Sequence, residues 1–466
     1  MTLTREALQQ LTKDELIEII LGLNARVLAL EAELRELKRA KAPFSKGTRK
    51  AAPKKPGRWA GQGVFKTRAE PEIKAGDIVI DLDAPLAVDA RNCPLCDVPL
   101  VTTNEEVTIE DMPAQPVREI KRIMVEIGVC PICGLRRRGD HPILGPRQCG
   151  ANAHQVGPQV LAHALWLHYD GGLPLRRVPG VIAQTTGIAI TQSALTQSAG
   201  KLCEDGGLLH GHYTELRSSV AGSAVVNTDD TGWRVSATLA FLMGFFTSDT
   251  AFYQIRSRHR HQEVIEVLGE DFGGLIGTDR GKSYEARAMD KMAMQKCLSH
   301  LLKNLSTVEA HKTGRAKSFS RELKATLREG LALWQSYQRK ELEIEDYRKQ
   351  GREIEAKLDH QLRERTLSDA DNQRLLKGIS YQHERGRLVL FLERPEIEPT
   401  NNRAERGLRP AVIARKVSHC SKNERGAQTY AVMKTLFTTL RLRCKDTVAA
   451  FASILRGGQM PLGGKG

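Results

Sequence analysis

Four acidic residues stand where their carboxylates could bind divalent metal ions. Asp229 and Asp230 follow a short apolar run in the segment NTDDTGW, Asp279 ends the run GGLIGTD, and Glu405 lies in TNNRAERGLRP, which begins like a helix. Carboxylate oxygens are the hard ligands that suit Mg²⁺ or Mn²⁺. Two such ions can hold the attacking and leaving oxygens of a phosphodiester.

Each acid also has an ordinary structural alternative. Asp279 could form a turn before Gly281. Glu405 could complete a helix capping box with Asn402, or pair with Arg409 one turn later. The order of the surrounding elements favours the metal site over these alternatives.

Residues 221–279 carry the pattern of a ribonuclease-H-like sheet. Three apolar runs (221–229, 237–249 and 250–258) read as strands, residues 259–272 as a helix, and 273–279 as a fourth strand. In such a sheet the first and fourth strands are neighbours, so strand ends would bring Asp229 or Asp230 close to Asp279. Residues 310–390 are charged and helical, and we interpret them as an insertion before the helix that carries Glu405.

Two CxxC pairs predict a structural zinc site. Cys93 and Cys96 form CPLC, and Cys130 and Cys133 form CPIC. Each pair can direct two thiolates at one ion, and two pairs complete a tetrahedral site. The segment between them alternates like strands, so we expect a zinc ribbon; a single CxxC would have left a redox motif open.

The N-terminal region predicts a dimer and a basic arm. Leucines recur every seven residues from Leu16 to Leu37, with branched residues at the other core position, which favours a parallel coiled coil. The alternative is an amphipathic helix packed on its own domain. Residues 38–66 then hold ten Lys/Arg and no acids, including Lys54 and Lys55, and we read them as a flexible arm that contacts phosphates.

The net charge of +15 is concentrated in two segments, which indicates a polyanionic partner such as nucleic acid. The second segment, 401–460, carries twelve Lys/Arg against three acids. Residues 153–205 look helical, with a tight turn at Gly187 that could form a helix-turn-helix DNA reader or simply pack two helices. No apolar run is long enough for a membrane span, so a cytoplasmic protein is expected.

Several motifs resemble the insertion-sequence-66 family of DDE transposases. NTDDTGW is similar to that family's first-aspartate segment, GTDRGKSY to its second, and QKCLSHLLKN to its C-x-x-H strand, here Cys297 and His300. TNNRAERGLRPAVIARK is the most specific match. The heptads and the paired CxxC motifs also stand in the family's order, so the resemblance spans nearly the whole chain.

The resemblance implies a bacterial, nucleoid-associated transposase that binds double-stranded DNA at element ends and at the target. It implies that Asp229, Asp279 and Glu405 bind two Mg²⁺ or Mn²⁺ ions, cut each 3′ end, and let the freed 3′-OH attack target DNA. Asp230 would then point to the other face of its strand, beside the site, as an acceptor orienting Thr231 or a basic side chain. A homodimer or larger assembly and accessory proteins of the same element are the further partners implied.

His300 could contact DNA or be a buried core histidine. The candidates for phosphate contacts near Glu405 are Arg406, Arg409, Arg415 and Lys416, with pairing to local acids as the alternative. Three other functions stay open: a ribonuclease-H-like nuclease that does not join ends, a DNA-binding regulator derived from a transposase, and a scaffold acting through its coiled coil.

The expected fold class is multidomain α/β. The domains expected are a leucine-zipper coiled coil at 1–40, a basic linker at 41–85, a zinc ribbon at 86–145, a helical domain at 146–212 with the helix-turn-helix DNA reader as one of its two alternatives, and a ribonuclease-H-like catalytic domain at 215–466 with the helical insertion at about 310–390.

Overall fold

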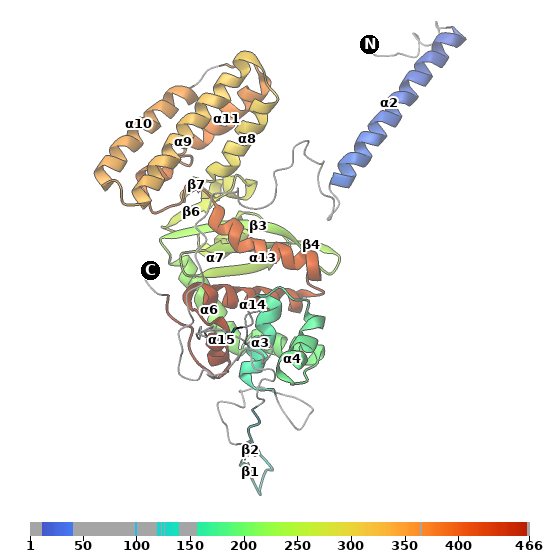
Figure 1. Cartoon of the computed structure of the whole chain (residues 1–466), viewed down its shortest axis with the longest axis vertical. Coiled ribbons are helices and arrows are strands. Elements are labelled where there is room, and N and C mark those ends of the chain that lie inside the picture. Colours follow the sequence, from blue (N-terminus) through green and yellow to red (C-terminus); the bar gives the residue numbers. More distant parts are fainter. Residues whose placement is uncertain are drawn as a thin grey trace. The chain divides into compact units, whose positions relative to one another are not determined.

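The computed structural model describes residues 12–40, 98–99, 119–122, 124, 126–138, 156–363 and 366–463. The chain divides into two compact units, Met1–Ala114 and Gln115–Gly466. The second unit contains a mixed α/β fold with a five-stranded sheet (Figure 1). No helix among these residues is long and apolar enough to cross a membrane.

The first unit contains the helix α2 (Lys13–Ala40). Thr12 and Glu15 cap its start, because the Thr12 backbone N–H donates to the Glu15 carboxylate at 2.8 Å. Apolar side chains of the predicted heptads, among them Ile20, Leu23, Val27 and Leu30, are exposed in the single chain. The helix is therefore present as predicted, and its pairing into a coiled coil stays a prediction.

The sheet has the strand order β5-β4-β3-β6-β7. Its strands are β3 (Val225–Val235), β4 (Thr238–Phe246), β5 (Ala251–Arg256), β6 (Leu275–Thr278) and β7 (Ala293–Lys296). β3, β4 and β5 are antiparallel, whereas β6 runs parallel to β3 and β7 parallel to β6. The helix α7 (His261–Leu268) connects β5 to β6. The prediction that the first and fourth strands are neighbours is confirmed.

The first strand is longer than the sequence predicted. We expected it to end at Asp229 or Asp230, but β3 continues to Val235 and pairs with β4 along its whole second half. The physical reason for the longer strand is Trp233, whose side chain is buried. Its ring centroid lies 4.9 Å from that of Tyr430, and its Nε1–H donates to Ser421 Oγ at 3.1 Å. The aspartate pair therefore lies in the middle of a strand.

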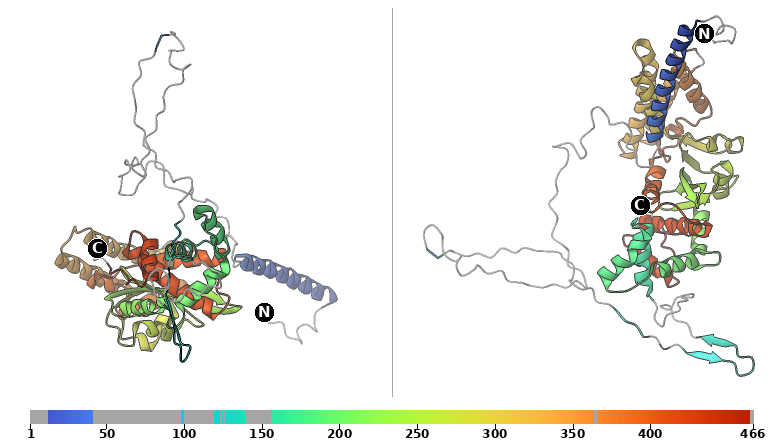
Figure 2. Two further views of the ribbon diagram at one scale, coloured as in Figure 1. Left: turned by 90° about the horizontal axis from the view of Figure 1, so that it is seen from below. Right: turned by 90° about the vertical axis from the view of Figure 1, so that its right-hand side faces the viewer.

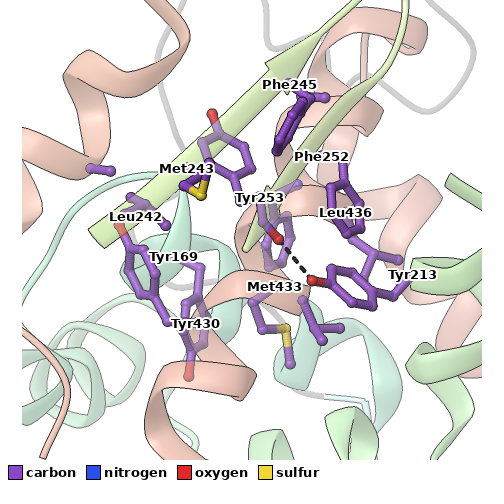
Figure 3. Close-up of a cluster of buried hydrophobic side chains, with 14 of the residues drawn as sticks. Tyr169, Tyr213, Leu242, Met243, Phe245, Phe252, Tyr253, Tyr430, Met433 and Leu436 are labelled. Atoms are coloured by element: carbon purple, nitrogen blue, oxygen red, sulfur yellow. Dashed lines mark hydrogen bonds between the residues drawn. The ribbon is translucent and has the colours of Figure 1, made fainter. Parts of the chain in front are cut away.

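Helices cover the sheet near β4 and β5. They are α3 (Pro158–Tyr169), α4 (Val178–Thr186), α5 (Gln192–Cys203), α6 (Leu208–Ala221), α14 (Glu424–Arg443) and α15 (Thr447–Leu455). Aromatic and aliphatic side chains from these helices and the sheet form one core, and Tyr213 donates to the Tyr253 carbonyl at 2.8 Å within it (Figure 3). The helix α6 runs through residues 212–215, where the sequence placed a domain boundary.

Other parts of the chain occupy both edges of the sheet. On α14, Thr435 and Thr439 accept from the backbone N–H groups of Tyr253 and Ala251 in β5, at 2.9 and 3.1 Å. At the opposite edge, the Lys296 N–H of β7 donates to the Arg387 carbonyl at 2.8 Å. These bonds satisfy backbone groups that an edge strand otherwise presents to solvent.

A helical block follows β7, where the insertion was predicted. It consists of α8 (Leu298–Ala310), α9 (Ser318–Gln338), α10 (Ile344–Leu362), α11 (Ala370–Glu384) and the short α12 (Leu390–Glu393). Figures 1 and 2 show this block at the β7 end of the sheet, opposite the end covered by α3 and α4. Its apolar side chains form a core of their own around Leu323, Tyr347 and Phe391.

Candidate acidic site and metal-binding residues

Asp229 and Asp279 occupy equivalent positions on neighbouring parallel strands. Asn227 of β3 is paired with Gly277 of β6, and each aspartate lies two residues beyond that pair. Asp279 directly follows the last residue of β6. One of its oxygens accepts from the Gly281 backbone N–H at 2.7 Å, so the turn foreseen as its alternative is also present.

The helix α13 (Asn402–Ser418) carries Glu405 to the same face of the sheet. Asp229 is paired with Gly244 of β4, and a side chain at Gly244 would contact Leu408 of α13. Gly407 lets the helix lie this close, because a Cβ atom there would fall 2.2 Å from the Phe246 ring. Glu405 therefore lies in the first turn of a helix packed against the face that Asp229 occupies.

The charges of the other acids act on the pKa of Asp229. The pKa of Asp229 is raised to about 7, first by burial and then by the negative charges of Asp279, Asp230 and Glu405. The Asp230 backbone N–H, which donates to Asp229 Oδ1 at 2.8 Å, opposes this shift. Among the described side chains, no Lys or Arg forms an ion pair with Asp229 or Asp279. Clustered carboxylates of this kind fit hard divalent cations such as Mg²⁺.

Asp230 faces the opposite side of the sheet. Its carboxylate lies 3.1 Å from His259 Nδ1, and the His259 ring stacks on Phe241 with centroids 3.8 Å apart. Thr231 lies on the same face as Asp229, and its Oγ1 accepts a hydrogen bond from Arg415 at 3.2 Å rather than bonding to Asp230. Of the two partners foreseen for Asp230, the structure shows a basic side chain, and that side chain is His259.

Asn401 joins the elements of the site and was not among the predicted site residues. This buried side chain donates to the Thr228 carbonyl at 2.8 Å and accepts from the Asn227 amide at 3.2 Å. Its backbone N–H donates to Cys297 Sγ at 3.1 Å. Asn401 thereby links β3, the start of α8 and the start of α13. Its signal in the sequence is the Asn-Asn pair before the helix.

Replacing Asn401 by Ala should cost about 1–3 kcal/mol of folding free energy, because the buried Thr228 carbonyl would lose its partner. The adjacent Asn402→Ala is the matched control, since Asn402 is only half-buried and the effect expected is under about 0.5 kcal/mol. Urea unfolding of the two variants and the parent measures both values. Equal losses from the two substitutions would contradict this role of Asn401.

His300 is exposed, so the alternative of a buried core histidine is wrong. The C-x-x-H segment, expected on a strand, directly follows β7 and forms the N-cap and first turn of α8. His300 therefore projects from a helix start, with its side chain 45 % exposed and its Nδ1 3.6 Å from Glu405 Oε1. Cys297 joins them: its Sγ and ligand atoms of His300 and Glu405 all lie within 4.8 Å of one another.

The basic residues of α13 divide into two groups. Arg406, Arg409 and Lys416 are exposed, and no acid among the described residues forms an ion pair with them. Arg415 is half-buried and donates to Thr231 Oγ1 and to the Gly232 carbonyl. The first group is free for an external partner, whereas Arg415 fixes the helix to β3. Lys54 and Lys55 lie outside the described residues.

The second CxxC pair lies on a small hairpin of β1 (Ile127–Val129) and β2 (Arg136–Arg138). The Cys130 N–H donates to the Leu135 carbonyl at 2.9 Å, and Gly134 has a φ of 68° that its lack of a side chain permits. Backbone N–H groups of Cys133 and Ile132 lower the pKa of Cys130. This turn suits a thiolate metal ligand. Cys93 and Cys96, the predicted partners, lie outside the described residues.

Comparison with known proteins places the chain among transposases. A model of the IS66 transposase family matches residues 153–429, which is more than half of the 466 residues. The chain therefore belongs to this family, and the resemblance seen in its motifs is confirmed. The matched region contains Asp229, Asp279 and Glu405. No curated protein matches the chain.

Proposed function

We propose that this protein binds the ends of a mobile element and catalyses metal-dependent DNA strand cleavage and strand transfer. The supporting observation is the acidic group on one face of the sheet. Asp229 and Asp279 share equivalent register positions, and Glu405 acts on the pKa of Asp229 from the adjacent helix. The order of strands around β3 is that of a ribonuclease-H-like sheet, and we assign the domain to that class.

Asp229, Asp279 and Glu405 would hold two Mg²⁺ or Mn²⁺ ions. When bound, such ions stabilise charge on the attacking and leaving oxygens of a phosphodiester. The carboxylates would hold and orient these ions, and the half-buried setting of Asp229 would limit competition from water. No covalent link between protein and DNA is needed, so the mechanism requires no nucleophilic Ser or Tyr.

The DNA would lie along the exposed side of α13. Arg406, Arg409 and Lys416 project from it within three turns of Glu405, and such side chains contact phosphates without reading sequence. The α4–α5 pair is a second candidate surface, because Gln192, Thr196 and Gln197 are exposed on α5 while Leu195 is buried. Lys54 and Lys55 would add contacts from the basic arm.

Two further parts complete the proposal. The exposed apolar side chains of α2 would pair with those of a second copy, which brings two catalytic domains to the two element ends. Cys93, Cys96, Cys130 and Cys133 would hold a structural Zn²⁺. The family resemblance further implies accessory proteins of the same element as partners and a location on bacterial DNA.

The test uses the full chain and a duplex carrying the terminal inverted repeats that flank this reading frame. With Mg²⁺ we expect new 3′-OH ends at the repeats, and pre-cut ends should become joined to a target plasmid. With EDTA neither product should form. Cleavage without joining would support the nuclease alternative, and binding without cleavage would support the regulator.

A further inference from the structure

We propose that Cys297, His300 and Glu405 form a site for a soft divalent ion, with Zn²⁺ as its natural occupant, and that occupation of this site inhibits cleavage by withdrawing Glu405 from the two aspartates. The regulatory part rests on the proposed function, whereas the ion site itself does not. We call these three residues the Cys-His-Glu site.

The distances fit a tetrahedral ion better than a hydrogen bond. His300 Nδ1 and Glu405 Oε1 are 3.6 Å apart, beyond the usual range of about 2.7–3.2 Å for N–H···O bonds. Ligands held about 2.0–2.3 Å from Zn²⁺ at tetrahedral angles lie about 3.3–3.8 Å from one another. The three ligand atoms already lie within 4.8 Å of one another, so a small contraction would close the set around an ion.

The backbone fixes the thiol of this site. Cys297 follows β7 directly, where its N–H donates to the Thr278 carbonyl at 2.8 Å. The next N–H, from Leu298, donates to the Pro399 carbonyl at 3.0 Å, which ties the start of α8 to the segment before α13. The Asn401 N–H donates to the sulfur itself at 3.1 Å. Outer hydrogen bonds of this kind orient metal ligands.

The donor set selects the ion. A thiolate, an imidazole and a carboxylate match Zn²⁺ and disfavour Mg²⁺, which prefers six oxygen ligands. Three protein ligands leave a fourth position for water. His300 and Glu405 are 45 % and 43 % exposed, so an ion can enter from solvent, while Cys297 forms the buried floor.

The two metal sites share Glu405, which makes them competitors. Its carboxylate cannot hold a position beside His300 and bridge to Asp229 and Asp279 at the same time. In the structure Glu405 lies beside His300, with Oε1 3.6 Å from the His300 Nδ1 atom. A thiolate-bound Zn²⁺ would stabilise that arrangement and leave the aspartate pair without its third ligand.

The first measurement counts metal. Full-length protein and its variants are loaded with Zn²⁺, dialysed and analysed for bound zinc, and Co²⁺ is added to follow thiolate-to-cobalt absorbance. Cys297→Ser and His300→Ala should each bind about one equivalent less than the parent, or bind Co²⁺ about tenfold or more weakly. Cys444→Ser, a free thiol elsewhere in the domain, is the matched control and should bind as the parent does.

The second measurement follows inhibition. Cleavage in Mg²⁺ is titrated with Zn²⁺, and each rate is expressed relative to that variant's own rate in Mg²⁺ alone. In the parent and Cys444→Ser, Zn²⁺ should lower the relative cleavage rate about tenfold or more. In Cys297→Ser and His300→Ala, it should lower that rate about twofold or less.

Equal metal content in the parent, Cys297→Ser and His300→Ala would overturn the Cys-His-Glu site. His300 is exposed, so its variant should fold even if Cys297→Ser does not. A lower metal content with undiminished Zn²⁺ inhibition would overturn the regulatory part. If no preparation cleaves DNA, the proposed function fails, and the metal count still decides whether the ion site exists.

Discussion

Asp229→Asn is expected to reduce Mg²⁺-dependent cleavage of element ends by about a thousandfold or more, equivalent to several kcal/mol of transition-state stabilisation. The amide keeps the size of the side chain but loses the charge that a divalent ion requires. Asp279→Asn and Glu405→Gln should have effects of the same order, because each removes a ligand from the same group. Single-turnover cleavage of a labelled duplex measures all three.

Asp230→Asn is the matched control for this series. It changes the adjacent aspartate in the same way, but that side chain faces His259 on the other side of the sheet. We expect at most about a tenfold effect, through the position of β3 rather than through a metal ligand. If Asp230→Asn abolished cleavage while Asp229→Asn did not, the assignment of faces would be wrong.

Asp229→Asn is also expected to stabilise the protein in magnesium-free buffer at pH 8. The pKa of Asp229 is raised to about 7 from a usual value of 3.8. A raised pKa means that the folded state holds this proton more tightly than the unfolded state does. The associated stability is fully present below about pH 4 and is lost as pH rises through 7. The gain from the substitution at pH 8 should be a few kcal/mol, at most about 4.

Urea unfolding at pH 4.5 and pH 8 tests this prediction. The parent and Asp229→Asn should differ little at pH 4.5, where most of the stability is still present in the parent, and clearly at pH 8. Saturating Mg²⁺ should stabilise the parent but not the variant, because only the parent retains the ligand. A variant that is less stable than the parent at pH 8 would show that the ionised Asp229 carboxylate does not destabilise the metal-free protein.

The succession of strands and helix along the chain could be predicted from the sequence, because apolar runs and turns are local signals. That the first and fourth strands are neighbours was inferred from the ribonuclease-H-like pattern of that succession. The separation of Asp229 from Asp230 also followed from strand geometry alone. The length of β3 could not be predicted from the sequence, since it depends on Trp233 packing against Tyr430, almost two hundred residues away in the chain. Local pattern carries no information about such a partner.

The residues that support the site were harder to foresee than the acids. Asn401 bonds to Thr228 across 173 positions of sequence, and His259 reaches Asp230 only because the start of α7 lies against that face of the sheet. The exposure of His300 was likewise set by tertiary structure, since the segment begins a helix rather than forming a strand. A motif can identify such residues without showing what they contact.

The occupied edges of the sheet bear on how copies of this protein meet. The proposed function would gather several copies on DNA, where their local concentration would be high. Because α14 and Arg387 already bond to backbone groups of β5 and β7, another chain cannot extend the sheet at these positions without first displacing them. If copies of this protein assemble as proposed, their contacts would form through helices and side chains rather than by extension of this sheet.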